Sequence, residues 1–86
     1  MRNYDRRMNA AYAALVRRLP SAAADRLRQS QRAWLAFRDA EATTRGAIYA
    51  TRQGTMYVSM ESDAAVTVVA DRARLLERYV RTIDIE

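Results

Sequence analysis

Apolar residues recur every three or four positions along almost the whole chain, and two short interruptions break this pattern. The first interruption is Pro20 and the second is the pair Gln53-Gly54. A spacing of three or four matches the 3.6-residue period of an α-helix, whereas no segment follows the two-residue alternation of a half-buried strand. With the interruptions as connections, the sequence predicts an all-α fold, an antiparallel three-helix bundle with a long central helix.

The two interruptions divide the chain into helices of unequal predicted length. We expect the first helix over residues 3–18 and the second over residues 22–51. At about 1.5 Å per residue, the second helix would be roughly 45 Å long and the longest of the three. Ser21 is the expected N-cap of the second helix, and Thr55 or Ser59 that of the third, because a hydroxyl accepts a hydrogen bond from an otherwise free backbone N–H.

One stripe of mainly apolar residues runs along each predicted helix and marks the side that should face the core. Trp34 is the single tryptophan and is expected to be the main core anchor. Gln31 and Arg38 lie one turn before and after it on the same face, where the guanidinium can stack on the indole ring. The stripes comprise Tyr4, Met8, Tyr12, Leu15 and Leu19; then Leu27, Gln31, Trp34 and Phe37 with Arg38, Glu41 and Ile48; then Val58, Ser62, Ala65, Val69, Ala73, Leu76, Val80 and Ile83.

The composition excludes several classes of protein. A chain of 86 residues suffices for one domain, residues 1–86, with a thin core. Cysteine and histidine are both absent, which removes disulfide scaffolds, zinc fingers, thiol nucleophiles and the usual general base at neutral pH. Carboxylates such as Asp39 and Glu41 are two positions apart and would point to different sides of a helix. We therefore expect no enzyme, no metal site and no cofactor.

The cations are all arginines, and they are unevenly distributed. Residues 1–52 hold 11 Arg against four acids, a balance of +7, whereas residues 53–86 hold 4 Arg against six acids, a balance of −2. Arginine suits bidentate contacts to phosphate, so an arginine-rich nucleic-acid- or anion-binding helical module is one open interpretation. A homo-oligomeric structural domain is another, because assembly often supplements a thin core. The arginines that would face phosphate are Arg17, Arg18, Arg26, Arg28, Arg32, Arg45 and Arg52.

The beginning of the chain gives two possible compartments. No stretch approaches the roughly 20 apolar residues of a membrane span. The first seven residues, Met-Arg-Asn-Tyr-Asp-Arg-Arg, lead into no apolar run of the kind found in a secretory signal. The protein is expected to be cytoplasmic if Met1 is the native start, or else to be the mature part of an exported protein.

Residues 31–41 carry the most distinctive pattern in the chain. They read Gln-Arg-Ala-Trp-Leu-Ala-Phe-Arg-Asp-Ala-Glu, which resembles the QRxWxxxRDxE motif of the LprI-type lysozyme inhibitor N-terminal domain family of small, mostly exported bacterial helical domains. Residues 8–19, 53–56 and 68–76 resemble the family's opening, turn and closing patterns, so that the resemblance covers residues 5–80. The motif residues, which we expect to be structural, are Gln31, Arg32, Trp34, Arg38, Asp39 and Glu41.

This resemblance implies a non-enzymatic periplasmic or secreted protein that inhibits lysozyme or another envelope hydrolase. It also implies a cysteine-less variant, because Ala42 and Ala64 occupy the positions of two family cysteines whose bridge would join the second and third helices. An inhibitor needs an exposed element that enters the enzyme's cleft. The second turn is the best candidate, because the guanidinium of Arg52 can pair with catalytic carboxylates. The candidate binding residues are Arg52, Gln53, Gly54, Thr55 and Tyr57.

Overall fold

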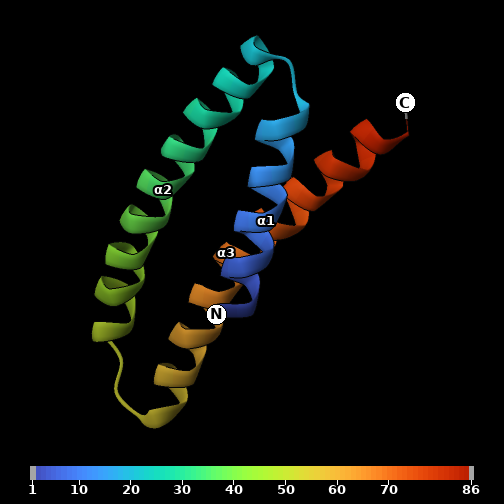
Figure 1. Ribbon diagram of the computed structural model, residues 1–86. Coiled ribbons are helices and arrows are strands. Elements are labelled where there is room, and N and C mark those ends of the chain that lie inside the picture. Colours follow the sequence, from blue (N-terminus) through green and yellow to red (C-terminus); the bar gives the residue numbers. More distant parts are fainter. Residues whose placement is uncertain (1, 86) are drawn as a thin grey trace.

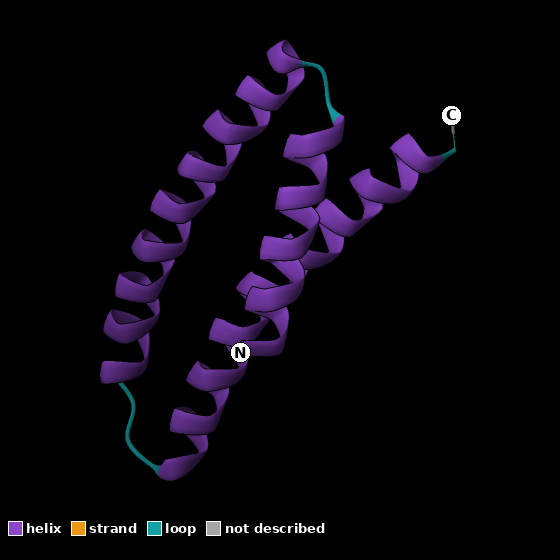
Figure 2. Ribbon diagram, in the orientation of Figure 1, coloured by secondary structure: helices purple, strands orange, loops and turns teal. Residues whose placement is uncertain are grey.

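Three α-helices joined by two short connections make up the fold. The computed structural model describes the backbone of residues 2–85 and their side chains, apart from those of Arg2 and Thr55. The helices are α1 (Arg2–Arg18), α2 (Ser21–Ala50) and α3 (Thr55–Asp84), and residues 2–85 contain no strand (Figure 1, Figure 2). The predicted all-α class is therefore confirmed. The central helix is long, as predicted, but it is not the longest, because α2 and α3 have 30 residues each.

The helices run up, down and up, and α1 packs mainly against α3. Contacts between these two helices advance together along the chain, from Tyr4 beside Arg74 through Arg7 beside Glu77 to Arg18 beside Asp84. Helices α1 and α3 are therefore parallel, and α2 returns antiparallel to both (Figure 1). Because α1 has 17 residues, the far half of the α2–α3 hairpin extends beyond its N-terminus.

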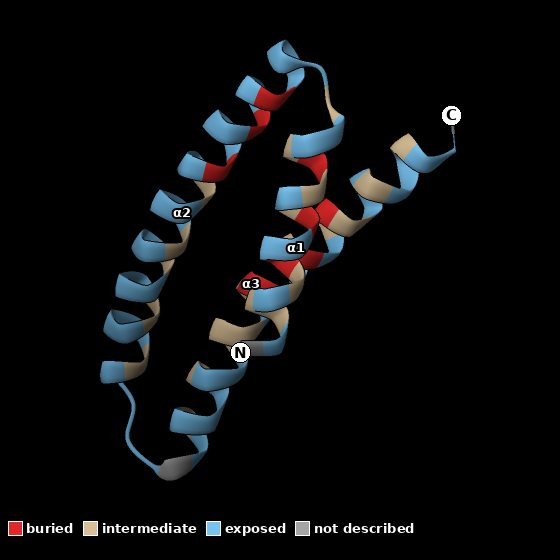
Figure 3. Ribbon diagram, viewed as in Figure 1, coloured by how far each residue is buried: buried red, intermediate tan, exposed pale blue. Residues whose placement is uncertain are grey.

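The core lies where α1, α3 and the first turns of α2 meet (Figure 3). Leu15 and Leu76 are the largest fully buried side chains, at 1% and 0% exposure. Ala11 and Ala73 are also buried, and such small side chains let two helix backbones approach closely. The cluster is completed by Met8 and Leu27, with Tyr4, Tyr12, Val16, Leu19, Trp34, Val80 and Ile83 packed at its margin.

The residues of the predicted apolar stripes face the core where α1 is present. Along the part of α2 and α3 that extends beyond α1, the prediction is wrong. Trp34 packs at the margin of the core and is only half-buried, so it is not the main anchor. Farther along the hairpin, Phe37, Ile48 and Val58 are 52%, 56% and 65% exposed. These side chains are exposed because α1, with 17 residues, cannot cover the full length of α2 and α3, which have 30 residues each.

The interface between α2 and α3, the two helices of the hairpin, contains charged groups. On α2, the half-buried positions after Trp34 are Arg38, Glu41, Arg45 and Tyr49. One guanidinium nitrogen of Arg45, Nη1, is buried without a hydrogen-bond partner among the described residues. Charged groups at such positions prevent the dry packing that apolar side chains would allow. These charged groups explain why α2 and α3 pack against each other more loosely than α1 and α3 do.

The helix starts differ by one residue from the predicted caps. Ser21 is the first residue of α2, and the cap position is taken by Pro20, whose carbonyl accepts a hydrogen bond from the Ala24 N–H at 2.9 Å. Likewise Thr55 is the first residue of α3 and the cap position is Gly54, while Ser59 lies inside the helix. Gly54 has a φ of +116°, a backbone conformation that L side chains rarely adopt, so this turn requires glycine.

Two arginines from different helices enclose the ring of Tyr4 and join α1 to α3. The guanidinium carbons of Arg7 and Arg74 lie 5.0 Å and 5.3 Å from the ring centroid. Arg7 also donates two hydrogen bonds to Glu77, at 2.9 Å from Nε and 2.7 Å from Nη2. These hydrogen bonds hold the pKa of the Glu77 carboxyl below its ordinary value and raise the pKa of Arg7.

Replacing Glu77 by Gln should remove part of the pH dependence of stability. Because the pKa of Glu77 is lowered in the folded state, its pairing stabilises the fold above the ordinary glutamate range and is lost as the pH falls through the lowered pKa. Urea denaturation at pH values between about 7 and 3 should show wild type more stable than E77Q at neutral pH and a shrinking difference in acid. A difference that stays constant across this range would contradict the assignment.

Candidate functional site

The residues of the 31–41 motif lie on two sides of α2. Gln31 is buried, at 8% exposure, and is the one buried polar side chain in the part of the chain that the structure describes. Arg32 and Asp39 are exposed, while Trp34, Arg38 and Glu41 are half-buried. The motif is therefore neither a wholly solvated face nor a simple core stripe.

Gln31 is held in place from α3. Arg72 donates a hydrogen bond from Nε to Oε1 of Gln31 at 3.0 Å, and another from Nη2 to the hydroxyl of Ser30 at 3.0 Å. Burial lowers the pKa of Arg72. A guanidinium only donates hydrogen bonds, so the amide oxygen of Gln31 must face Arg72 and its Nε2 must face away. Nε2 lies 3.7 Å from the Sδ of Met8, which is a weak acceptor.

Arg38 is oriented by its neighbours on α2. Its guanidinium carbon lies 5.6 Å from the centroid of the Trp34 ring, which confirms the stacking predicted from their spacing. Its Nη2 also lies 3.3 Å from Oδ1 of Asp39. The indole ring and the carboxylate therefore restrict the conformations available to this guanidinium, although its side chain is 39% exposed.

A hollow of about 580 Å³ lies between α1 and α2, and three motif residues line it. Gln31, Arg32 and Arg38 belong to its α2 wall, together with Arg28. Asp5 lies on the opposite α1 wall. Arg28 also pairs with Asp25 at 2.8 Å. The remaining lining residues are Met8, Asn9 and Tyr12 from α1 and Leu35 from α2.

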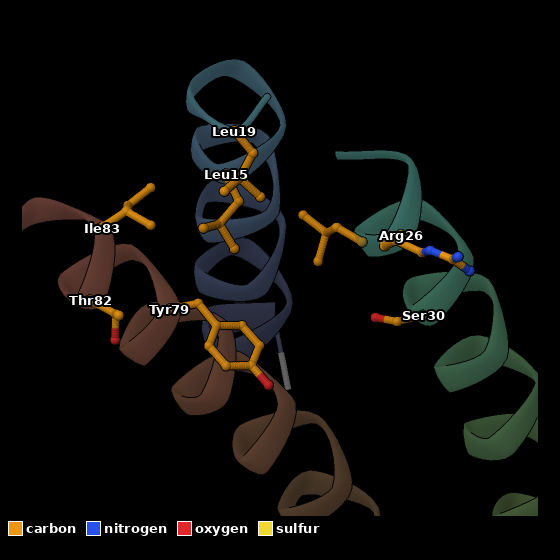
Figure 4. A pocket seen from close by; sticks show the side chains of 8 residues that line it. Leu15, Leu19, Arg26, Ser30, Tyr79, Thr82 and Ile83 are labelled. Carbon is orange, nitrogen blue, oxygen red and sulfur yellow. The ribbon is translucent and has the colours of Figure 1, made fainter. Parts of the chain in front are cut away.

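A second hollow of about 390 Å³ opens where the end of α1 meets the start of α2 and the end of α3 (Figure 4). Leu15 and Leu19 of α1 face Tyr79 and Ile83 of α3 across it. Arg26, Ser30 and Thr82 place polar groups at its border, and Leu27 completes the lining. Its wall is almost entirely apolar and forms an exposed extension of the core.

The predicted binding turn lies at the far end of the hairpin. Arg52, Gln53 and Gly54 are exposed and Tyr57 is half-buried, whereas the side chain of Thr55 lies outside the described part. Backbone hydrogen bonds fix both ends of the turn, from the Arg52 N–H to the Tyr49 carbonyl at 3.1 Å and from the Tyr57 N–H to the Gly54 carbonyl at 3.3 Å. The turn therefore presents Arg52 and Gln53 to solvent between two anchored helix ends.

The seven arginines proposed to face phosphate do not share one environment. Arg26 borders the apolar hollow, whereas Arg28 and Arg32 border the hollow between α1 and α2. Arg18 pairs with Asp84 at the same end of the bundle as Arg26, whereas Arg45 is half-buried in the second half of α2. Nucleic-acid binding through these residues stays a prediction.

Within residues 2–85, no group of three or more acidic side chains is placed to hold a metal ion. Over the same residues, no helix combines the length and apolar character needed to cross a membrane.

Residues 2–85 therefore form an all-α fold of three helices, in which arginines of α2 border a hollow and an exposed turn ends the α2–α3 hairpin. The family model described as "Lysozyme inhibitor LprI" matches residues 1–76, and the chain belongs to this family. This match confirms the resemblance of the 31–41 motif and its flanking segments. Searches of the curated proteins and of the solved structures gave no match.

The sequence patterns assigned no role to the residues of α3 that organise the site, although Arg72 lies in the closing pattern of residues 68–76. Arg72 holds Gln31, and Arg74 and Glu77 bind the first turns of α1. One signal was present, because Arg72 lies three residues after Val69 and four before Leu76, at the edge of the buried stripe. Such a position is suited to an arginine that reaches a partner at a helix interface.

Replacing Gln31 by Leu should destabilise the protein although it adds apolar surface. Leu keeps a similar volume, but Arg72 then loses its Gln31 acceptor at a partly buried position, which costs about 1–3 kcal/mol. Urea denaturation should show a lowered midpoint for Q31L. The matched control is Q29L, because Gln29 is exposed and its replacement should shift the midpoint little. Equal midpoints for the two variants would show that the Gln31–Arg72 contact contributes no stability.

Proposed function

We propose that this protein is a non-enzymatic inhibitor that binds lysozyme or another envelope hydrolase through the free end of its α2–α3 hairpin, residues 52–60. Membership of the lysozyme inhibitor family supports the inhibitory role. The observation that carries the choice of surface is the projection of this hairpin end beyond α1 (Figure 1). Such an inhibitor acts where its target is, so the proposal includes action in the bacterial envelope or outside the cell.

The hairpin end offers apolar side chains to a partner. Met56, Val58 and Met60 are 63%, 65% and 45% exposed. Methionine is flexible and polarizable, and it adapts to irregular protein surfaces. Met56 and Met60 lie one turn apart on the same side of α3, and exposed apolar groups of this kind are typical of a protein–protein interface, because their burial drives association. The first two turns of α3 therefore supply the apolar part of the proposed interface.

The charge of the hairpin fits a basic enzyme better than the net charge of the chain does. The whole chain carries +5, but residues 53–71 contain Glu61, Asp63 and Asp71 and no arginine. Animal lysozymes are strongly basic, and opposite charge accelerates the encounter of two proteins. This acidic stretch would orient the hairpin end toward such an enzyme.

Arg52 provides the group that would act inside the enzyme's cleft. Glycoside hydrolases use a pair of carboxylates, and a guanidinium binds a carboxylate through two parallel hydrogen bonds. Arg52 is exposed at the end of the hairpin, so it is available for such a contact. Gln53 follows it and supplies further hydrogen-bonding groups at the same end.

The proposal is tested by mixing the purified protein with lysozyme in a turbidity assay on bacterial cell walls. Wild type should slow the clearing of the suspension, and R52A should need about tenfold more protein for the same effect, because interface residues that bind in a cleft carry much of the affinity. The matched control is R6A, because Arg6 is an exposed arginine on α1. R6A should inhibit as wild type does.

Two outcomes of this assay would contradict the proposal. No slowing at a large molar excess of wild type would exclude inhibition of the lysozyme used. Equal inhibition by wild type, R52A and R6A would place the inhibitory surface elsewhere. Circular dichroism of the variants should show unchanged helix content, since both residues are exposed.

A further inference from the structure

We propose that the hollow between α1 and α2 is a binding site for a small molecule that carries a carboxylate or phosphate group. Gln31 would donate a hydrogen bond to this group from the wall of the hollow, and Arg32 and Arg38 would pair with it. This site is separate from the hairpin end and does not depend on the inhibitory role. It gives a common role to Gln31, Arg32 and Arg38, the three polar residues of the 31–41 motif that line the hollow.

The strongest support is the unused hydrogen-bonding capacity of Gln31. The side chain is more than nine-tenths buried, at 8% exposure, and it lines the hollow. Its oxygen is occupied by Arg72, at 3.0 Å. Its Nε2 carries two hydrogens, yet its contact is the sulfur of Met8 at 3.7 Å. Sulfur is a weak acceptor, so an anionic oxygen in the hollow would offer Nε2 a stronger hydrogen bond than Met8 does.

The charge of the lining has the sign that such a ligand requires. Arg28, Arg32 and Arg38 contribute three positive charges and Asp5 one negative charge. Arg28 and Arg38 are each partly neutralised by an aspartate on α2. Arg32 makes no ion pair or hydrogen bond among the described side chains and is free to bind. A guanidinium that meets carboxylate or phosphate forms charge-assisted hydrogen bonds.

The size and the apolar wall of the hollow set limits on the ligand. Its volume of about 580 Å³ lies within the usual range for small-molecule sites, about 300–1,000 Å³. Met8, Tyr12 and Leu35 line it beside the polar groups. A ligand that combines an anionic group with an apolar or ring-shaped part would therefore use both kinds of wall.

The test is an NMR titration of the ¹⁵N-labelled protein with two probes, inorganic pyrophosphate and citrate. The side-chain NH₂ signals of Gln31 report directly on the proposed contact. We expect these signals to shift and saturate with at least one probe, and the probe that binds more tightly shows whether the site prefers phosphate or carboxylate. With R32Q, the dissociation constant should rise by about tenfold or more, because a charge-assisted hydrogen bond is lost.

The matched control is R17Q, which removes the same charge from an exposed position on α1 outside the hollow. Its dissociation constant should stay within about twofold of wild type, because charges at the exposed surface are screened by salt. The proposal is overturned if the Gln31 signals do not respond to either probe. It is also overturned if R32Q and R17Q weaken binding equally, because binding would then follow net charge alone.

Discussion

One short helix covers one half of a long hairpin, and this difference in length organises the whole structure. Helix α1 has 17 residues, whereas α2 and α3 have 30 each. The core cluster, which includes Leu15, Leu76, Ala11 and Ala73, lies where α1 is present. The far half of the hairpin lacks this third helix, and several of its large apolar side chains, among them Phe37, Ile48 and Val58, stay exposed. The chain therefore has a packed end and an open end.

The two ends carry different polar groups, and these suit different partners. Beside α1, the arginines of α2 border a hollow whose wall includes the nearly buried amide of Gln31. At the open end, the first half of α3 has acids and no arginine, and exposed methionines accompany them. The proposed small-molecule site uses the first surface, and the proposed inhibitory interface uses the second. The net charge of +5 describes neither surface, because it averages over both.

The three helices could be predicted from periodicity, because Pro20 and Gly54 interrupt a regular spacing. The spacing marks one face of each helix but does not show how much of that face a partner helix covers. It therefore wrongly predicts Trp34, Phe37, Ile48 and Val58 as core residues, whereas they lie at the margin of the core or are exposed. The family could be inferred from the 31–41 motif. The partners of that motif could not, because Arg72 meets Gln31 across a distance of 41 residues in sequence. Contacts of that kind depend on how the helices cross, which periodicity does not encode.

The most direct test of the central claim, that only half of the hairpin is packed, is amide hydrogen exchange followed residue by residue. Exchange protection rises with burial and with the number of packed neighbours. We predict slow exchange for residues 8–15, 24–31 and 69–80, and exchange at least tenfold faster for residues 36–48 and 58–65, since each factor of ten corresponds to about 1.4 kcal/mol of opening free energy. Uniform protection along the full length of α2 and α3 would contradict the account.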